Sequence, residues 1–381
     1  MQSQGLSRRR LLAAAGLVTL PPRVAGAAER LRITKVELFR VAVPMQPDIV
    51  HSPEIVEADF TMVPKFILKV HTDSGIVGIG ETARGEDGAR LAQNTEFLRG
   101  KNILELNLTR LELPARAGYT AIEMALYDIV GKAVGWPVWR LLGGLAQPKV
   151  LVGYWCGRKN AADMRRVAQR AVAGKFTSVK MKCALGDPVV EAVQAIHDVS
   201  PALKVIFDPN TRFKNYATFL PVAKALDAIG NVLVMEDPFD KNDLAGYREL
   251  RRQVKAHVTL HLADPRAMIQ AIKAEACSVF NTGPAPGMAG FVANCYLAAA
   301  AGMPVWHGSG HDLGICDAAY LHSCAAAANC TLPSDILSYQ RVDDLLTQPI
   351  EIRDSYAIVP NRPGLGFELD EDAVRRYQVK G

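Results

Sequence analysis

Two lysines, Lys180 and Lys182, stand one residue apart in the run SVKMKC, which otherwise has the composition of a buried β-strand. Because side chains alternate along a strand, both lysines are expected on one face, with Val179 and Met181 on the other. Two ammonium groups on one inward face repel each other and lose hydration. Taken alone, the run would indicate an exposed edge strand with solvated lysines, so an inward pair requires acidic groups in front of it.

Acidic residues end the strand-like runs that follow. Asp208 opens DPN, Glu236 opens EDP and Asp264 precedes Pro265. Asp208 follows Lys182 by 26 residues, and each later carboxylate follows the one before it by 28 residues. Carboxylates that converge at one rim repel unless a cation joins them, and hard oxygen ligands suit Mg²⁺. We therefore predict one Mg²⁺ held by the three carboxylates. The alternative for each of them is that it caps the helix that follows.

Strand-like runs alternate with helical patterns after residue 148. The strand-like runs are VLVGYW (150–155), SVKMK (178–182), KVIF (204–207), NVLVM (231–235), HVTLHLA (257–263), ACSVFN (276–281) and MPVWH (303–307). Between them lie patterns such as DPVVEAVQAIHDV and MAGFVANCYLAAAA, which have helical periodicity. Seven or eight such units favour an α/β fold with a (β/α) barrel over an open doubly wound sheet. In such barrels the functional groups lie at the C-terminal ends of the strands.

This arrangement predicts proton-transfer chemistry. A divalent ion would bind a substrate carboxylate and stabilise the dianion that forms when the α-proton leaves. Lys182 is the expected base, and the positive charge of Lys180 would help to lower the pKa of Lys182, so that Lys182 can act as a base near neutral pH.

With these motifs the chain resembles the enolase superfamily, in its mandelate racemase and muconate-lactonizing branch. Members use a Lys or His base with Mg²⁺ to stabilise an ene-diolate. The resemblance implies that Asp208, Glu236 and Asp264 are the metal ligands and that Lys180-x-Lys182 is the K-x-K motif, with Lys182 as base. It also implies a capping domain over residues 28–147, a barrel over 148–340, and a C-terminal segment, 341–381, that returns to the capping domain. The expected partner is a small carboxylate substrate, and the expected assembly is a homo-oligomer.

Departures from the family pattern limit how far the reaction can be named. Asn281 ends the sixth strand, where relatives carry a second catalytic lysine or an aspartate, and an amide is neither acid nor base. His307 and His311, in VWHGSGHD, are candidate catalytic groups, although His307 is one residue away from the family's histidine position. Either could instead be structural, as a hydrogen-bonded core histidine or as a residue that caps a loop.

Candidate substrate contacts come from several segments. Asn281 and Asn210, the latter in the DPN run, are expected at the barrel mouth. His51 lies in the loop QPDIVHSPEIVEADF (46–60), where the family has a specificity loop, and Tyr154 ends the first strand. A solvated loop position for His51 and plain packing for Tyr154 are the alternatives.

The N-terminal residues 1–27 have the pattern of a twin-arginine signal peptide. Arg8, Arg9 and Arg10 precede a short apolar run, and Ala25-Gly26-Ala27 supplies an A-x-A cleavage site. Ten apolar residues are too few to span a bilayer, which needs about 20, so we expect a periplasmic protein without a membrane anchor. Removal of the segment lowers the net charge from +5 to +1, because it takes away four arginines and no acid. A near-neutral chain gives no support for nucleic-acid or membrane-surface binding.

Three functions remain open at this point. The first is a Mg²⁺-dependent lyase that removes water from a hydroxy-carboxylate such as a sugar acid, because a syn elimination can run with one lysine and a single acid. The second is a racemase or epimerase, which needs proton donors on both faces of the enolate. The third is an exported binding protein without catalysis, which would not need a base.

Overall fold

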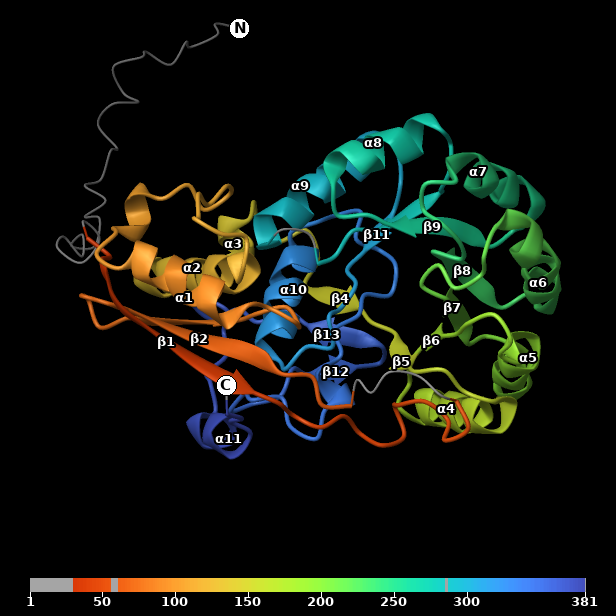
Figure 1. Ribbon diagram of the computed structural model, residues 1–381, viewed down its shortest axis with the longest axis horizontal. Coiled ribbons are helices and arrows are strands. Elements are labelled where there is room, and N and C mark those ends of the chain that lie inside the picture. Colours follow the sequence, from red (N-terminus) through yellow and green to blue (C-terminus); the bar gives the residue numbers. More distant parts are fainter. Residues whose placement is uncertain (1–29, 56–60, 285–286, 381) are drawn as a thin grey trace, which may run out of the picture.

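The computed structural model describes residues 30–55, 61–284 and 287–380. The predicted signal peptide, residues 1–27, lies outside these ranges, and its role in export stays a prediction. Figure 1 shows two lobes, with the capping domain on the left and the barrel on the right. Within the described ranges, none of the helices combines the length and the apolar character needed to cross a membrane.

The capping domain is an antiparallel sheet covered by helices. Its strands are β1 (Ile33–Val41), β2 (Lys65–Thr72) and β3 (Val77–Glu81), and its helices are α1 (Gly88–Leu98), α2 (Tyr119–Val134) and α3 (Val138–Leu141). Helix α2 comes very close to β3. A Cβ on Gly78 or Gly80 would lie 2.2 or 2.0 Å from a carbonyl oxygen of α2, so glycine is required at both positions. The alternating glycines of the GIGE run therefore have a packing role.

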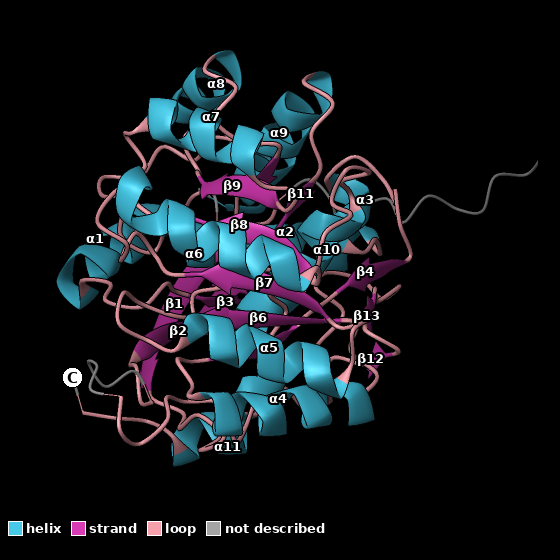
Figure 2. Cartoon of the chain, turned by 90° about the vertical axis from the view of Figure 1, so that its right-hand side faces the viewer, coloured by secondary structure: helices cyan, strands magenta, loops and turns pink. Residues whose placement is uncertain are grey.

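In the described part of the barrel, seven parallel strands follow one another in space in the order of the sequence. They are β5 (Tyr154–Cys156), β6 (Ser178–Lys182), β7 (Lys204–Asp208), β8 (Val232–Glu236), β9 (His257–His261), β10 (Val279–Asn281) and β11 (Val305–Trp306). Their connecting helices are α4 (Ala161–Ala173), α5 (Val189–Val199), α6 (Tyr216–Ile229), α7 (Leu244–Gln253), α8 (Pro265–Lys273), α9 (Gly287–Ala300) and α10 (Ile315–Ala325). Figure 2 shows helices α4 to α9 stacked on the outer side of the strands. The predicted barrel is confirmed.

An eighth extended segment, residues 329–335, fills the gap between β11 and the first strand. The amide of Asp335 donates to the carbonyl of His307, and the amide of Ser334 donates to the carbonyl of Leu151, both at 2.8 Å. Parallel bridges join Cys330 to Val305 and Ser334 to Val152. Asp335 therefore stands at the C-terminal end of the eighth position of the ring.

The end of the chain returns to the capping domain, as the resemblance implies. Strands β12 (Ile352–Arg353) and β13 (Tyr356–Ile358) pair with β4 (Lys149–Leu151), and a last helix, α11 (Glu371–Arg376), follows. The amide of Ala42 donates to the carbonyl of Tyr377, and the amide of Val379 donates to that of Arg40, both beside β1.

Two layers of side chains follow from the alternation along the strands. Ile206, Val234, Val279 and Trp306 fill the inside of the barrel, whereas the residues between them pack outward against the helices. Residues at the strand ends that share the inward parity point into the mouth.

Candidate active site

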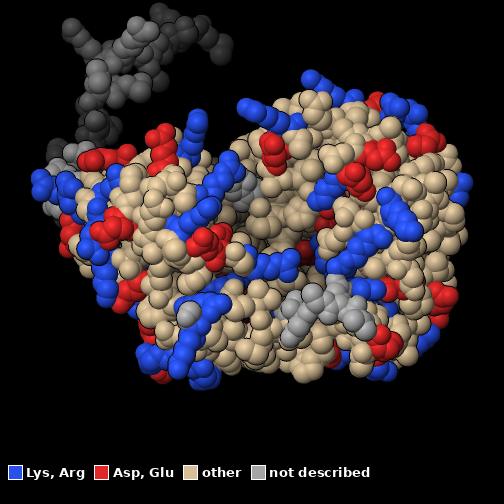
Figure 3. Space-filling model, viewed as in Figure 1, with Lys and Arg blue, Asp and Glu red and all other residues tan. Residues whose placement is uncertain are grey.

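A cavity of about 360 Å³ lies at the C-terminal ends of the barrel strands. Its walls include Lys180, Lys182, Asp208, His261 and Asn281 from the barrel, and His51, Val63 and Arg84 from the capping side. Figure 3 shows a hollow between the two lobes, with Lys and Arg side chains along its edge. Both domains thus contribute to one site at the rim where barrel enzymes carry their chemistry.

Lys182 lies level with Asp208 in neighbouring strands, as the inward parity of the K-x-K motif predicts. Its ammonium contacts the carboxylate of Asp208 and lies 2.8 Å from Oδ1 of Asn210. The Lys182 side chain is 19% exposed, so it reaches from the wall into the cavity. Lys182 is therefore placed to exchange a proton with a bound molecule.

Lys180 lies deeper and is surrounded by carboxylates. Its Nζ is 2.9 Å from Oε2 of Glu236, 2.9 Å from Oδ2 of Asp335 and 3.3 Å from Oδ2 of Asp208. Burial disfavours the ammonium form, but the three carboxylates outweigh burial and raise the pKa of Lys180 well above its usual range. Lys180 is thus a fixed positive charge beneath the site rather than a base. Its predicted effect on the basicity of Lys182 stays a prediction.

Asp335 is a site residue that sequence reasoning missed. Burial raises its pKa to about 6, although the Lys180 ammonium opposes this shift. The segment that carries Asp335, TLPSD, contains a proline and no apolar alternation, so no strand signal marked it. Asp335 reaches the site because residues 329–335 pair with β11 and with the start of the barrel, which closes the ring.

Asp264 does not join the other two carboxylates, which corrects the prediction that all three converge. Strand β9 ends at His261, and its register pairs Thr259 with Glu236. Asp264 lies beyond the strand as the N-cap of α8, is exposed, and accepts a hydrogen bond of 2.9 Å from the amide of Arg266. The helix-capping alternative therefore describes Asp264, and it is not among the residues that line the cavity.

His261 occupies the fifth-strand position instead. Burial lowers its pKa to about 4, so the imidazole is neutral near pH 7. Its Nδ1 lies 3.6 Å from Oε1 of Glu236, and its Nε2 contacts the carbonyl oxygen of Gly283. The alternation along β9 places His261 on its inward face, so the sequence contains the information that identifies it. The acidic pattern of the neighbouring strand ends instead favours Asp264.

The comparisons with known proteins identify the family. Residues 35–143 match the mandelate racemase / muconate lactonizing enzyme N-terminal domain, and residues 163–373 match the enolase C-terminal domain-like family. The chain belongs to the enolase superfamily, in its mandelate racemase/muconate-lactonizing branch.

Its relatives in that branch catalyse several reactions. The chain is similar to an N-succinylamino acid racemase of Thermus thermophilus, at 29% identity over 68% of this chain and 70% of that protein. It is also similar to muconate cycloisomerase 1 of Rhodococcus opacus, at 25% identity over 91% of this chain and 98% of that protein. The crystal structure of muconate lactonizing enzyme from Pseudomonas fluorescens complexed with muconolactone has a TM-score of 0.81 to this structure, at 22% identity over 92% and 100% of the two chains.

Enolase-superfamily enzymes typically use Mg²⁺, and two of the predicted ligands fit a divalent cation. Asp208 and Glu236 end adjacent strands, and both are buried. Each has a carboxylate oxygen within 3.3 Å of the Lys180 ammonium, so both carboxylates already face a positive charge. Although burial opposes ionisation, Lys182 and Lys180 hold the pKa of Asp208 well below its usual range. Both carboxylates would hold the metal ion, with His261 beside them in place of a third carboxylate.

Asn281 lies at the end of β10 and lines the cavity, as predicted. Its Nδ2 donates to Oε1 of Glu236 at 2.7 Å, and its Oδ1 accepts from the amide of Gly283 at 3.3 Å. The amide therefore orients a candidate metal ligand, and it supplies no base on the sixth strand.

The remaining candidates divide between cavity and core. Asn210, His51 and His311 line the cavity. Burial lowers the pKa of His311 to about 3, so it is neutral near pH 7. His307 is instead 2% exposed and stacks on Tyr320 with ring centroids 3.9 Å apart, which places it in the core.

Tyr154 does not line the cavity, which corrects its prediction as a substrate contact. It has the outward parity of β5 and packs on Phe176 and Tyr339, with ring centroids 5.3 and 5.4 Å away. Its neighbour Trp155 pairs with Lys180 and lines the cavity. Arg212 also lines the cavity but was not among the predicted residues.

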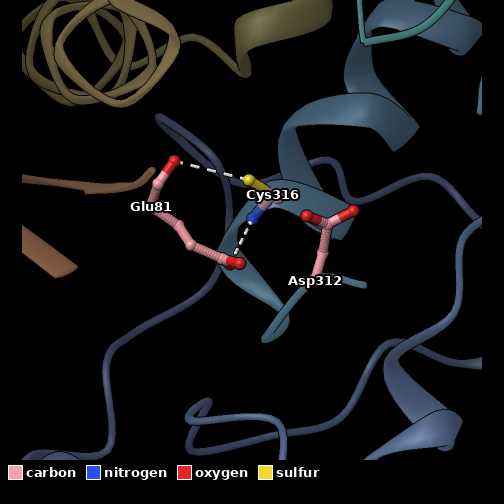
Figure 4. Close-up of side chains that lie close together, drawn as sticks. All are labelled: Glu81, Asp312 and Cys316. Atoms are coloured by element: carbon pink, nitrogen blue, oxygen red, sulfur yellow. Dashed lines mark hydrogen bonds between the residues drawn. The ribbon is translucent and has the colours of Figure 1, made fainter. Parts of the chain in front are cut away.

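A buried ion cluster supports the mouth from the capping side. The ammonium of Lys65 lies 2.7 Å from Oε1 of Glu81 and 2.5 Å from Oδ1 of Asp312. Glu81 also accepts hydrogen bonds of 2.9 Å from the amides of Leu313 and Cys316, and Figure 4 shows Glu81, Asp312 and Cys316 facing one another. Because Asp312 follows the cavity residues Ser309 and His311, the cluster fixes this loop to β2 and β3.

Proposed function

We propose that this enzyme removes the α-proton of a small hydroxy-carboxylate with Lys182 and then eliminates water. The observation that carries the proposal is the pairing of one cavity-facing lysine on the second strand with an amide on the sixth. In a ring of eight positions the second and sixth lie opposite each other, so Lys182 and Asn281 approach a substrate from opposite faces.

The reaction needs one proton carrier. Lys182 as the free amine takes the α-proton, the β carbon–oxygen bond breaks, and hydroxide leaves with a proton as water. In a syn elimination the proton lost and the group that leaves share one face, so the same Lys182 ammonium can return its proton. A divalent ion, when bound, supplies positive charge to the substrate carboxylate and its enolate.

The other residues of the cavity support binding and orientation. Asn210 holds the Lys182 ammonium at 2.8 Å, and Asp335 can hold a proton in mildly acidic solution because its pKa is about 6. Arg84 and Arg212 line the cavity, and their charges favour a substrate with polar or anionic groups beyond the reacting carboxylate.

A racemase or epimerase is the second candidate, and the names of relatives favour it. These include the N-succinylamino acid racemase above and an L-Ala-D/L-Glu epimerase of Bacillus subtilis, which is 24% identical over 88% of this chain. Racemisation needs a second proton carrier on the face that Asn281 occupies. A binding protein without catalysis is disfavoured, because binding alone does not require Lys182.

A substrate panel tests the proposal. Acid sugars and N-acyl amino acids are incubated with the protein and millimolar Mg²⁺ or Mn²⁺, and the products are identified by mass spectrometry and NMR. We expect loss of 18 Da from a hydroxy acid, and no turnover after chelation with EDTA. Products with unchanged mass and inverted configuration would replace the lyase assignment with the racemase one.

A further inference from the structure

The imidazole of His261 is oriented so that its free nitrogen faces a carboxylate. Nε2 contacts the carbonyl oxygen of Gly283, which only accepts, so Nε2 carries the proton. In the neutral ring Nδ1 then has a lone pair, and it lies 3.6 Å from Oε1 of Glu236. Two acceptors then face each other across this gap, an arrangement that a cation bound to both would stabilise.

The position of His261 in the barrel points to the same cation. Asp208, Glu236 and His261 end the third, fourth and fifth strands of the ring, so their side chains follow one another along a single rim. Ligand atoms of Glu236, Asp237 and His261 all lie within 4.8 Å of one another.

Asp237 belongs to this group but has other partners. One of its oxygens accepts from the amide of His261 at 2.9 Å, and the other lies 2.7 Å from the Lys241 ammonium. Asp237 therefore fixes the end of β9 and leaves Nδ1 of His261 as the free ligand atom on that strand.

We propose that His261 is the third metal ligand through Nδ1, beside Asp208 and Glu236, and that this imidazole shifts the preferred ion from Mg²⁺ toward Mn²⁺. Imidazole binds borderline ions better than it binds Mg²⁺, which takes oxygen ligands. The carbonyl of Gly283 acts as the outer partner that fixes the ring, as is usual for histidine ligands. The inference rests on the divalent ion of the proposed function, but its test requires no turnover.

Pulsed electron paramagnetic resonance of the Mn²⁺-loaded protein gives a direct readout. We expect ¹⁴N modulation from a coordinated imidazole in the wild-type protein and its loss in His261→Asn. The Mn²⁺ affinity should fall by at least the roughly 10–100-fold that loss of an outer-shell partner typically costs. His261→Asp, which restores an all-oxygen set, should change the ratio of Mg²⁺ to Mn²⁺ affinity at least about tenfold in favour of Mg²⁺.

Two control variants separate this assignment from its alternatives. Asp264→Asn keeps a good N-cap and should retain both Mn²⁺ affinity and ¹⁴N modulation. His307→Asn removes a buried histidine of the core and should leave the modulation unchanged.

Mn²⁺ bound without ¹⁴N modulation, modulation that persists in His261→Asn, or a loss of binding in Asp264→Asn would each overturn the assignment. All three results would leave the role of Lys182 intact, because proton removal is measured separately by isotope exchange.

Discussion

Lys182→Ala is expected to lower kcat by at least about 10²–10⁴-fold, the contribution typical of a positioned general base. The Lys182 side chain reaches into the cavity, whereas Lys180, the other lysine of the strand that lines it, is held by three carboxylates. Steady-state kinetics on the substrate found by the panel would measure the loss.

The matched control is Lys204→Ala, which removes an exposed lysine at the N-terminal end of β7, at the opposite end of the strand from the site. Lys204 is not among the residues that line the cavity, so its removal should reduce kcat far less. Circular dichroism and Mn²⁺ binding should show that Lys182→Ala keeps its fold and its metal. Turnover near the wild-type rate in Lys182→Ala would mean that another group, such as His311, is the base.

Lys65→Met is expected to reduce the free energy of unfolding by about 3–5 kcal/mol, because it leaves the buried carboxylates of Glu81 and Asp312 without a counter-charge. Burial disfavours the Lys65 ammonium, but Asp312 and Glu81 outweigh it and raise its pKa far above the usual range. Although burial favours the protonated form, the Lys65 ammonium lowers the pKa of Asp312 to about 2. Urea denaturation followed by circular dichroism would measure the change.

Lys69→Met is the control on the same strand. Its ammonium pairs with Glu371, whose side chain is 44% exposed, and such pairs contribute about 0–1 kcal/mol. If Lys65→Met and Lys69→Met reduce the free energy of unfolding by the same amount, the buried cluster does not hold the capping domain to the barrel loop as the contacts indicate.

The barrel could be predicted because strand and helix periodicities alternate and because parallel strands must share a rim. That logic placed Lys180, Lys182, Asp208 and Glu236 correctly with no structural information. It failed at Asp264, where the strand ends three residues earlier and the carboxylate becomes a helix cap. A DP pair marks a strand end and a helix start equally well, so the sequence alone does not separate the two roles.

Other site residues depend on contacts distant in the sequence. Asp335 enters the site only because residues 329–335 close the ring between β11 and the first strand. The inward face of β9 identifies His261 only after its register with Glu236 is known. For His307 and Tyr154 the packing alternative describes the structure, because imidazole and aromatic side chains at strand ends also suit packing, and here both pack against other rings.

The stereochemical course of isotope exchange tests the central claim, that Lys182 alone carries the proton, most directly. A single enantiomer of a responsive carboxylate is incubated with wild-type protein and a divalent ion in D₂O, and the recovered substrate is analysed by NMR and chiral chromatography. We predict deuterium at the α-carbon with retained configuration, and no deuterium with Lys182→Ala. Deuterium in the opposite enantiomer would show a second proton carrier on the face of Asn281 and would contradict the account.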